Sequence, residues 1–90
     1  MKFVWSAAKA AANVKKHGVT FEEASSVFLD VLAATGADPD HSIGEARWIT
    51  FGTSNSGRLL LVSYTDQRDT IRIISARPCT AAERKLYEKS

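Results

Sequence analysis

The chain has 90 residues, of which 44% are hydrophobic and two are proline, and its formal net charge is +2 at pH 7. This length and composition predict a single domain over residues 1–90 and exclude a second one. The longest aliphatic run, Leu59 to Val62, is too short to cross a membrane, and the N-terminal residues lack the apolar core of a secretory signal, so we expect a cytoplasmic protein. The single Cys79 excludes an intramolecular disulfide and has no zinc-ligand spacing around it.

Charge is unevenly distributed along the chain. The first 21 residues contain four lysines and no acidic residue, residues 22–45 contain six acids and no lysine or arginine, and all six arginines lie from Arg47 onward. Folding could therefore bring the two basic segments together as one positive surface of the kind that binds nucleic acids. The alternative, which composition alone favours, is the mixed surface of an ordinary soluble protein.

The first 29 residues predict a strand and two helices. Ser6 is a suitable N-cap for an alanine-rich helix, and Gly18 is suited to end that helix in a left-handed conformation. Thr20 and Glu23 have the T-x-x-E spacing of a capping box, which marks the start of another helix. The predicted elements are a short strand over residues 1–5, a helix over residues 7–17 and a helix over residues 21–29.

The rest of the chain predicts four strands and a closing helix. Segments rich in β-branched and aromatic residues alternate with turn formers, and Pro78 marks the end of the last segment. A second T-x-x-E spacing, Thr80 with Glu83, predicts a helix that ends at about Glu88. The predicted strands are residues 31–35, 45–52, 58–65 and 70–77, with an exposed loop over residues 36–44. The order β-α-α-β-β-β-β-α indicates the α+β class, with helices packed on a small antiparallel sheet.

Four polar side chains of the first predicted helix share one face. Lys9, Asn13, Lys16 and His17 are spaced i, i+4, i+7 and i+8, which places them within an arc of roughly 100°. The alanines and Val14 cover most of the remaining surface, so we expect the helix to bury that smooth side and to present the polar stripe. One interpretation of the stripe is a ligand site. The other is that lysine and histidine are favoured at the negative end of the helix dipole, and spacing alone leaves both open.

The arginines of the predicted strands can be assigned to faces by alternation. Arg72 and Arg77 are five residues apart in one strand, so they point to opposite faces unless a bulge lies between them. Arg47 shares its face with Ile49 and Phe51. Both faces of each strand are partly apolar, so one face should carry the helices and the other should form a half-covered groove or a partner-binding surface. Alternatively, each arginine is a strand-end residue that extends its charge into solvent.

Four segments of the chain match a family pattern in order and spacing: KAAANVKKHGVTFEEA, DPDHSIGEARWITFG, GRLLLVSYT and IRIISARPCTAAERKLYE. Together they resemble the successive signature blocks of the BrnT toxin family of bacterial type II toxin–antitoxin systems. The K-x-x-x-N-x-x-K-H-G-V-x-F-E-E-A run begins at Lys9, the D-x-x-H-S-x-G-E-x-R block begins at Asp38, and the R-I-I-S-A-R block covers residues 72–77. The chain departs from the pattern at Pro78, where the family commonly has a further arginine.

This resemblance implies a RelE-like fold and a ribonuclease that cleaves RNA and stops translation. It further implies a cognate antitoxin of the BrnA type, whose ribbon-helix-helix portion binds operator DNA. The toxin would then contact DNA only through its partner, and no membrane association is expected.

The chain contains the residue types that metal-independent RNA cleavage requires: a base for the 2′-hydroxyl proton, cations for the phosphorane and an acid for the leaving 5′-oxygen. His17 is the first candidate for proton transfer, and Arg47 and Arg77 are candidate phosphate clamps because a guanidinium can bind two phosphate oxygens at once. We expect these three side chains to converge on one groove. The other candidates are Lys16, Glu45 and Tyr64 as catalytic reserves, Lys9, Arg58 and Arg72 for the flanking RNA backbone, and Trp48 or Tyr64 for base stacking. The sequence contains no cluster of carboxylates that would indicate a metal site, and we expect no cofactor.

Some alternatives stay open at the level of sequence. His41 either carries a second proton or belongs to a block that holds its turn together, and the turn role is favoured by the neighbouring aspartates. For the whole chain, the alternatives to a ribonuclease are an RNA- or DNA-binding module without cleavage, and an inactivated toxin that acts through its partner complex.

Overall fold

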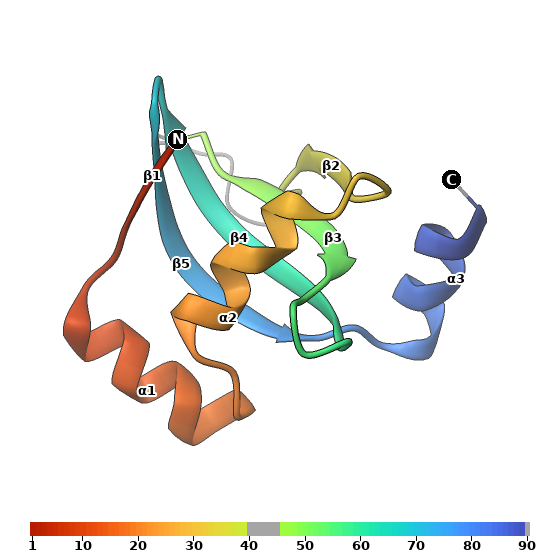
Figure 1. Cartoon of the computed structure of the whole chain (residues 1–90), viewed down its shortest axis with the longest axis horizontal. Coiled ribbons are helices and arrows are strands. Elements are labelled where there is room, and N and C mark those ends of the chain that lie inside the picture. Colours follow the sequence, from red (N-terminus) through yellow and green to blue (C-terminus); the bar gives the residue numbers. More distant parts are fainter. Residues whose placement is uncertain (40–45, 90) are drawn as a thin grey trace.

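Residues 1–39 and 46–89 are described by a computed structural model, and the candidates His41 and Glu45 lie outside this part of the chain. The described residues form an α+β fold around a five-stranded sheet with strand order β1-β5-β4-β3-β2 (Figure 1). Along the chain the elements are β1 (Lys2–Val4), α1 (Ala7–His17), α2 (Phe21–Ser26), the 3₁₀ helix η1 (Val27–Leu29), β2 (Ala34–Ala37), β3 (Trp48–Thr53), β4 (Leu59–Gln67), β5 (Thr70–Pro78) and α3 (Ala81–Lys89). Within the described part of the chain, no helix is long and apolar enough to span a lipid bilayer.

The sheet is mixed, whereas the sequence predicted an antiparallel one. Strands β2, β3, β4 and β5 follow one another in the sheet and pair antiparallel in that order, as expected. Strand β1 instead pairs in parallel with β5, with Phe3 opposite Ile71. Because two helices separate β1 from the other strands in sequence, no hairpin dictates the direction in which it pairs.

The corner between α1 and α2 follows the predicted capping pattern. The N–H of Lys9 donates to the Ser6 hydroxyl at 3.3 Å, and α1 ends where Gly18 adopts a left-handed φ of 67°. Thr20 then caps α2, because its hydroxyl accepts a hydrogen bond of 3.0 Å from the N–H of Glu23. Both helices therefore begin where the sequence predicted them to begin.

Asp30 organises a turn over residues that the sequence predicts as the start of a strand. Helix α2 ends at Ser26 and continues as η1, and strand β2 begins at Ala34 rather than at Val31. The Asp30 carbonyl accepts from the Ala33 N–H at 3.0 Å, and its carboxylate accepts from the Leu32 N–H at 2.9 Å. These bonds close a turn over residues 30–33, so Val31 is 95% exposed and cannot belong to a buried strand.

The hydrophobic core lies between α2, η1 and one face of the sheet, which we call the inner face. In β4 this face carries Leu60, Val62 and Tyr64, which are buried together with side chains from α2 and β5. A Cβ at position 52 would lie 2.6 Å from Cγ1 of Val27, so glycine at this position is what lets η1 pack directly on β3.

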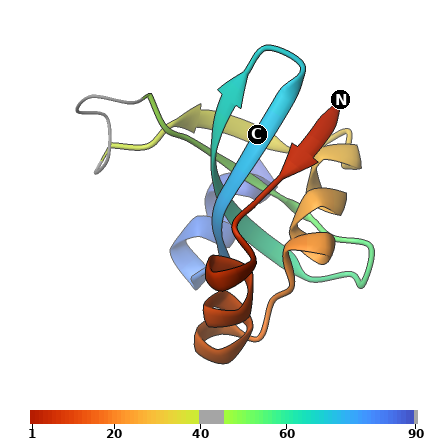
Figure 2. The same ribbon diagram turned by 90° about the vertical axis from the view of Figure 1, so that its left-hand side faces the viewer.

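The opposite side of the sheet, the outer face, is only partly covered. Helix α3 lies on this side and α2 on the other, as Figure 2 shows. No side chain of α3 is buried. The helix is attached through the Tyr87 hydroxyl, which donates to the Asp30 carboxylate at 2.6 Å, and through an ion pair between Glu83 and Arg77. The half-covered groove expected from the strand pattern therefore lies on the face away from the core.

Candidate functional site

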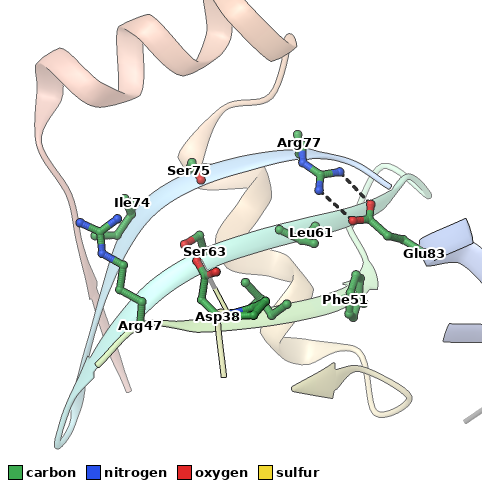
Figure 3. A pocket seen from close by; sticks show the side chains of 11 residues that line it. Asp38, Arg47, Phe51, Leu61, Ser63, Ile74, Ser75, Arg77 and Glu83 are labelled. Carbon is green, nitrogen blue, oxygen red and sulfur yellow. Dashed lines mark hydrogen bonds and ion pairs between the residues drawn. The ribbon is translucent and has the colours of Figure 1, made fainter. Parts of the chain in front are cut away.

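The outer face holds a pocket of about 400 Å³, which we call the outer groove (Figure 3). Residues directly opposite one another in paired strands place their side chains on the same face, and the floor consists of two such rows. One row is Ile49, Ser63 and Ser75, and the other is Phe51, Leu61 and Arg77. The remaining lining residues are Asp38, Pro39, Arg47, Ile74 and Glu83.

A β-bulge in β5 shapes this groove. Ser63 is paired with Ser75 and Tyr64 with Ile73, so Ile74 has no partner in the register. The extra residue reverses the alternation, and Ile73 and Ala76, three positions apart, both point into the core. Arg72 and Arg77 consequently share the outer face, whereas an unbroken strand would have separated them.

Arg77 is positioned at one end of the groove by the first turn of α3. Its Nη1 and Nη2 donate to Oε1 and Oε2 of Glu83 at 2.7 and 2.8 Å, and Oε1 also accepts from the Thr80 N–H at 2.9 Å. The Arg77 guanidinium lowers the pKa of Glu83 to about 2, so this carboxylate is ionised and holds the fork in place.

Arg47 lies at the other end of the groove, as Figure 3 shows. Its carbonyl accepts from the N–H of Asp38 at 2.9 Å, which ties the start of β3 to the end of β2. The two arginines proposed as phosphate clamps therefore both line the outer groove, one at each end.

A second, shallower pocket of about 270 Å³ lies against α1 and is lined by Lys9, Ala12, Asn13, Lys16, His17, Ile74 and Ser75. We call it the α1 pocket. It shares Ile74 and Ser75 with the outer groove; Ile74 is the unpaired residue of the β5 bulge, and Ser75 follows it. His17 lines the α1 pocket and not the outer groove, so the structure does not bring His17, Arg47 and Arg77 into one groove as expected; the two pockets adjoin at Ile74 and Ser75.

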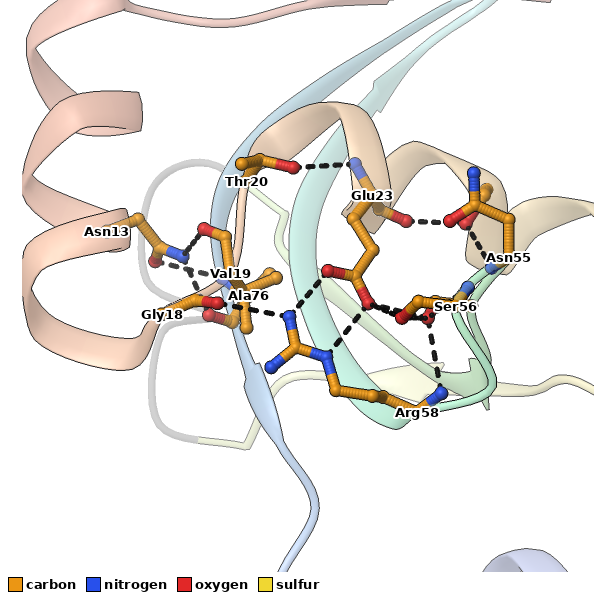
Figure 4. Close-up of polar contacts among 11 residues, drawn as sticks. Asn13, Gly18, Val19, Thr20, Glu23, Asn55, Ser56, Arg58 and Ala76 are labelled. Atoms are coloured by element: carbon orange, nitrogen blue, oxygen red, sulfur yellow. Dashed lines mark hydrogen bonds and ion pairs between the residues drawn. The ribbon is translucent and has the colours of Figure 1, made fainter.

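Asn13 is not an exposed member of that stripe but its structural anchor. It is 6% exposed, and its amide nitrogen donates to the carbonyls of Val19 at 2.9 Å and Ala76 at 2.8 Å, while its amide oxygen accepts from the Ala76 N–H at 3.1 Å (Figure 4). The amide takes the place of a neighbouring strand on the edge of β5, beyond the point where β1 has ended. The expected burial of Val14 is wrong, because that side chain is 44% exposed and the face with Asn13 packs on the sheet.

Arg58 belongs to a different cluster, on the inner side of the sheet (Figure 4). Its Nε donates to Oε2 of Glu23 at 3.0 Å, and its Nη2 donates to the Gly18 carbonyl at 3.0 Å. Ser54 donates to the same carboxylate at 2.7 Å. The hydrogen bond from Arg58, together with those from the serines, lowers the pKa of Glu23 to about 2. Arg58 therefore joins the α1–α2 corner to the start of β4 and does not line the outer groove.

The remaining candidates are dispersed. Tyr64 is 5% exposed in the core, where its hydroxyl accepts from Thr50 at 3.1 Å and its ring meets Phe28 edge-on. Trp48 pairs with Tyr64 and so shares the inner face, where it is 38% exposed. Arg72 is exposed on the outer face without lining either pocket, and Lys9 and Lys16 are exposed on α1.

Several lining residues were not identified from the sequence. Phe51 and Leu61 read as ordinary strand residues, and Ser63, Ser75 and Glu83 come together only through strand pairing and the placement of α3. A signal for Asn13 was available, since asparagine is a poor helix former in the middle of an alanine-rich helix. In the described part of the chain, no three histidine, cysteine, aspartate or glutamate side chains are grouped as metal ligands.

Comparison with known proteins gives the context for this geometry. A family model described as the ribonuclease toxin BrnT of type II toxin–antitoxin systems matches residues 5–83. The fold is similar to the crystal structure of the Brucella abortus ribonuclease toxin BrnT, with a TM-score of 0.65 and 20% sequence identity over 89% of this chain and 97% of that one. A search of curated proteins gives no match. Because the family model spans most of its length, the chain belongs to the BrnT family of ribonuclease toxins of type II toxin–antitoxin systems.

Proposed function

We propose that the chain is a metal-independent endoribonuclease whose active site is the surface formed by the α1 pocket and the outer groove. The observation that carries the proposal is that both pockets share Ile74 and Ser75. This sharing puts His17 on one side of the β5 bulge and Arg47 and Arg77 on the other. A phosphodiester lying over the bulge would have an imidazole and two guanidinium groups on its flanks.

The chemistry assigned to these residues is intramolecular transesterification. His17 accepts the proton of the 2′-hydroxyl, the 2′-oxygen attacks phosphorus, and the bond to the 5′-oxygen breaks. Arg47 and Arg77 stabilise the charge on the phosphorane oxygens, and Lys16 is placed beside His17 as a proton donor for the leaving oxygen. The products are a 2′,3′-cyclic phosphate and a 5′-hydroxyl.

In the cell, we propose that this activity inhibits translation and is neutralised by an antitoxin of the BrnA type. The family description supports an antitoxin partner, because it assigns the family to type II toxin–antitoxin systems. In this proposal the ribbon-helix-helix part of the antitoxin contacts operator DNA, and the toxin reaches DNA only through that partner.

The decisive experiment is incubation of the purified chain, freed of antitoxin, with total RNA in EDTA. We expect fragments that end in a 2′,3′-cyclic phosphate. The triple variant His17→Ala, Arg47→Ala, Arg77→Ala should give no cleavage and no growth arrest when it is expressed without antitoxin. Full cleavage by a folded triple variant would reject this site, and cleavage that requires a divalent metal would reject the mechanism.

One observation favours a second candidate function, an inactivated toxin that retains its partner contact. The Arg77 guanidinium is already paired with the Glu83 carboxylate, which competes with a phosphate for it. This alternative predicts a tight antitoxin complex and no RNA cleavage by the free chain at any concentration tested.

A further inference from the structure

The outer groove has an apolar patch that phosphate binding does not require. Phe51 and Leu61 face the groove from neighbouring strands, with Ile49 beside them on β3. A phosphate group would not be stabilised by contact with this apolar patch. The faces of nucleobases are themselves apolar, and they stack on aromatic rings. The floor therefore suits a base better than a backbone.

Polar groups frame this apolar patch in the arrangement that a nucleotide needs. The row of Ser63 and Ser75 lies two residues along the strands from the row of Phe51 and Leu61, a separation of roughly 6.6 Å at about 3.3 Å per residue. Serine hydroxyls can both donate and accept, so they can pair with the edge of any base. The phosphate would then lie toward Ser75 and Ile74, the residues shared with the α1 pocket.

The volume of the groove agrees with this arrangement. About 400 Å³ is room for a single nucleotide, and is far too small for a paired helix to enter. A base can reach the floor only if it is unpaired and turned out of any stack.

We infer that the outer groove is a nucleobase pocket in which Phe51 stacks one unpaired base of single-stranded RNA beside the scissile phosphate. This inference rests on the proposed function, because it deepens the identity of the substrate at the same surface. It assigns Phe51 and Leu61 to substrate binding, and it makes the absence of base pairing the first requirement on the substrate.

The test is the affinity of the full chain for short 2′-O-methylated oligonucleotides, which cannot be cleaved because they have no free 2′-hydroxyl. Fluorescence anisotropy at one fixed salt concentration would compare a single strand, its duplex, and a strand of the same length whose sugars carry no bases. We expect the single strand to bind about tenfold more tightly than the abasic strand, as for one base–aromatic stack. Equal affinity for the single strand and the abasic strand would overturn the inference.

Single substitutions show which side chain causes the difference in affinity between the single strand and the abasic strand. Phe51→Ala should remove the difference between the two strands, and Phe51→Trp should retain it because the aromatic face remains. Leu32→Ala, which truncates a side chain that is 69% exposed in the turn after η1, is the control and should change neither affinity. Loss of the difference in Trp48→Ala but not in Phe51→Ala would put the base on the inner face and overturn the assignment.

The two proposals fail in different ways. If base-dependent binding is observed but unmodified RNA stays intact, the ribonuclease mechanism is rejected while the pocket stands. If RNA is cleaved but the abasic strand binds as well as the normal one, the pocket is rejected while the ribonuclease stands.

Discussion

Two corners of the molecule, each at the start of a helix, have the same T-x-x-E pattern, but the glutamates of the two patterns bind different parts of the structure. At residues 20–23, Glu23 holds Arg58 and two serines of the β3–β4 turn, and the cluster packs over the core side of the sheet. At residues 80–83, Glu83 holds Arg77 at the end of the outer groove, on a helix with no buried side chain. In both corners a threonine hydroxyl accepts the N–H of the glutamate three residues later.

The difference teaches that a capping pattern determines where a helix starts and says little about what the glutamate then does. The first carboxylate stabilises a joint between α2 and the strands behind it. The second orients a guanidinium that faces the candidate substrate site. The same ion-pair chemistry therefore contributes to stability in one corner and to the geometry of the site in the other.

Removing the arginine of each corner in turn should give the largest difference between the two corners. If the proposed mechanism holds, Arg77→Ala should slow cleavage of RNA by about 100-fold or more, because it removes a guanidinium that the mechanism assigns to the phosphorane. Arg58→Ala should reduce cleavage per folded molecule much less, since Arg58 does not line the outer groove. Single-turnover cleavage rates with saturating RNA measure both, and equal losses would contradict the division of roles.

Asn13 tests how firmly the first corner is tied to the strand that carries the site. Asn13→Ala removes three buried hydrogen bonds to Val19 and Ala76 and leaves their backbone groups unpaired, so the free energy of unfolding should fall by about 3 kcal/mol. Val14→Ala, one position further along the same helix and 44% exposed, is the matched control. Urea denaturation would show the difference, and similar midpoints for the two variants would refute the anchoring role.

Acid should weaken both corners within the same pH range but with different consequences. The folded pKa values of Glu23 and Glu83 are lowered to about 2, so each ion pair contributes stability above the ordinary carboxyl pKa of 4.5 and loses it as pH falls toward 2. The free energy of unfolding should therefore decrease from pH 4.5 to pH 2. Glu23→Gln should flatten this dependence more than Glu83→Gln, as measured by denaturation at a series of pH values. The reverse order would mean that α3 contributes more to global stability than its exposure indicates.

The smallest expected effect is the difference between removing the Thr20 cap and removing the Thr80 cap. Thr20→Ala should lower the free energy of unfolding by about 1 kcal/mol, the usual value of an N-cap. Thr80→Ala should fray α3 locally and leave global unfolding nearly unchanged, because no side chain of that helix is buried. Hydrogen exchange of the α3 amides, read beside urea denaturation, distinguishes local from global loss. A global loss in Thr80→Ala as large as that in Thr20→Ala would contradict this prediction.

Much of the fold could be predicted because its signals are local. The bounds of α1, the starts of α2 and α3 and the succession of strands follow from caps, turn formers and alternation within a few residues. The start of β2 could not be predicted in this way. It depends on Asp30, whose carboxylate also accepts from the Thr53 N–H at 2.8 Å across the fold.

The candidate site was predictable in part for the same reason. Helical spacing places Lys9, Lys16 and His17 on one face, and these three residues line the α1 pocket, whereas Arg47 and Arg77 line the outer groove. Strand alternation alone could not decide whether Arg72 and Arg77 share a face, because a bulge depends on the register with β4 rather than on the residues of β5.

By itself, the sequence determined the order of the elements, the helix starts and the family, since each depends on neighbours along the chain or on a pattern of fixed spacing. Only the tertiary structure decided which side chains meet. The unpaired Ile74 turned Arg77 toward the outer groove, Asn13 became a strand-like partner for the edge of β5, and Glu83 came to lie against Arg77. Each of these contacts depends on strand register and helix placement, which are set by packing across the whole core rather than by any local signal.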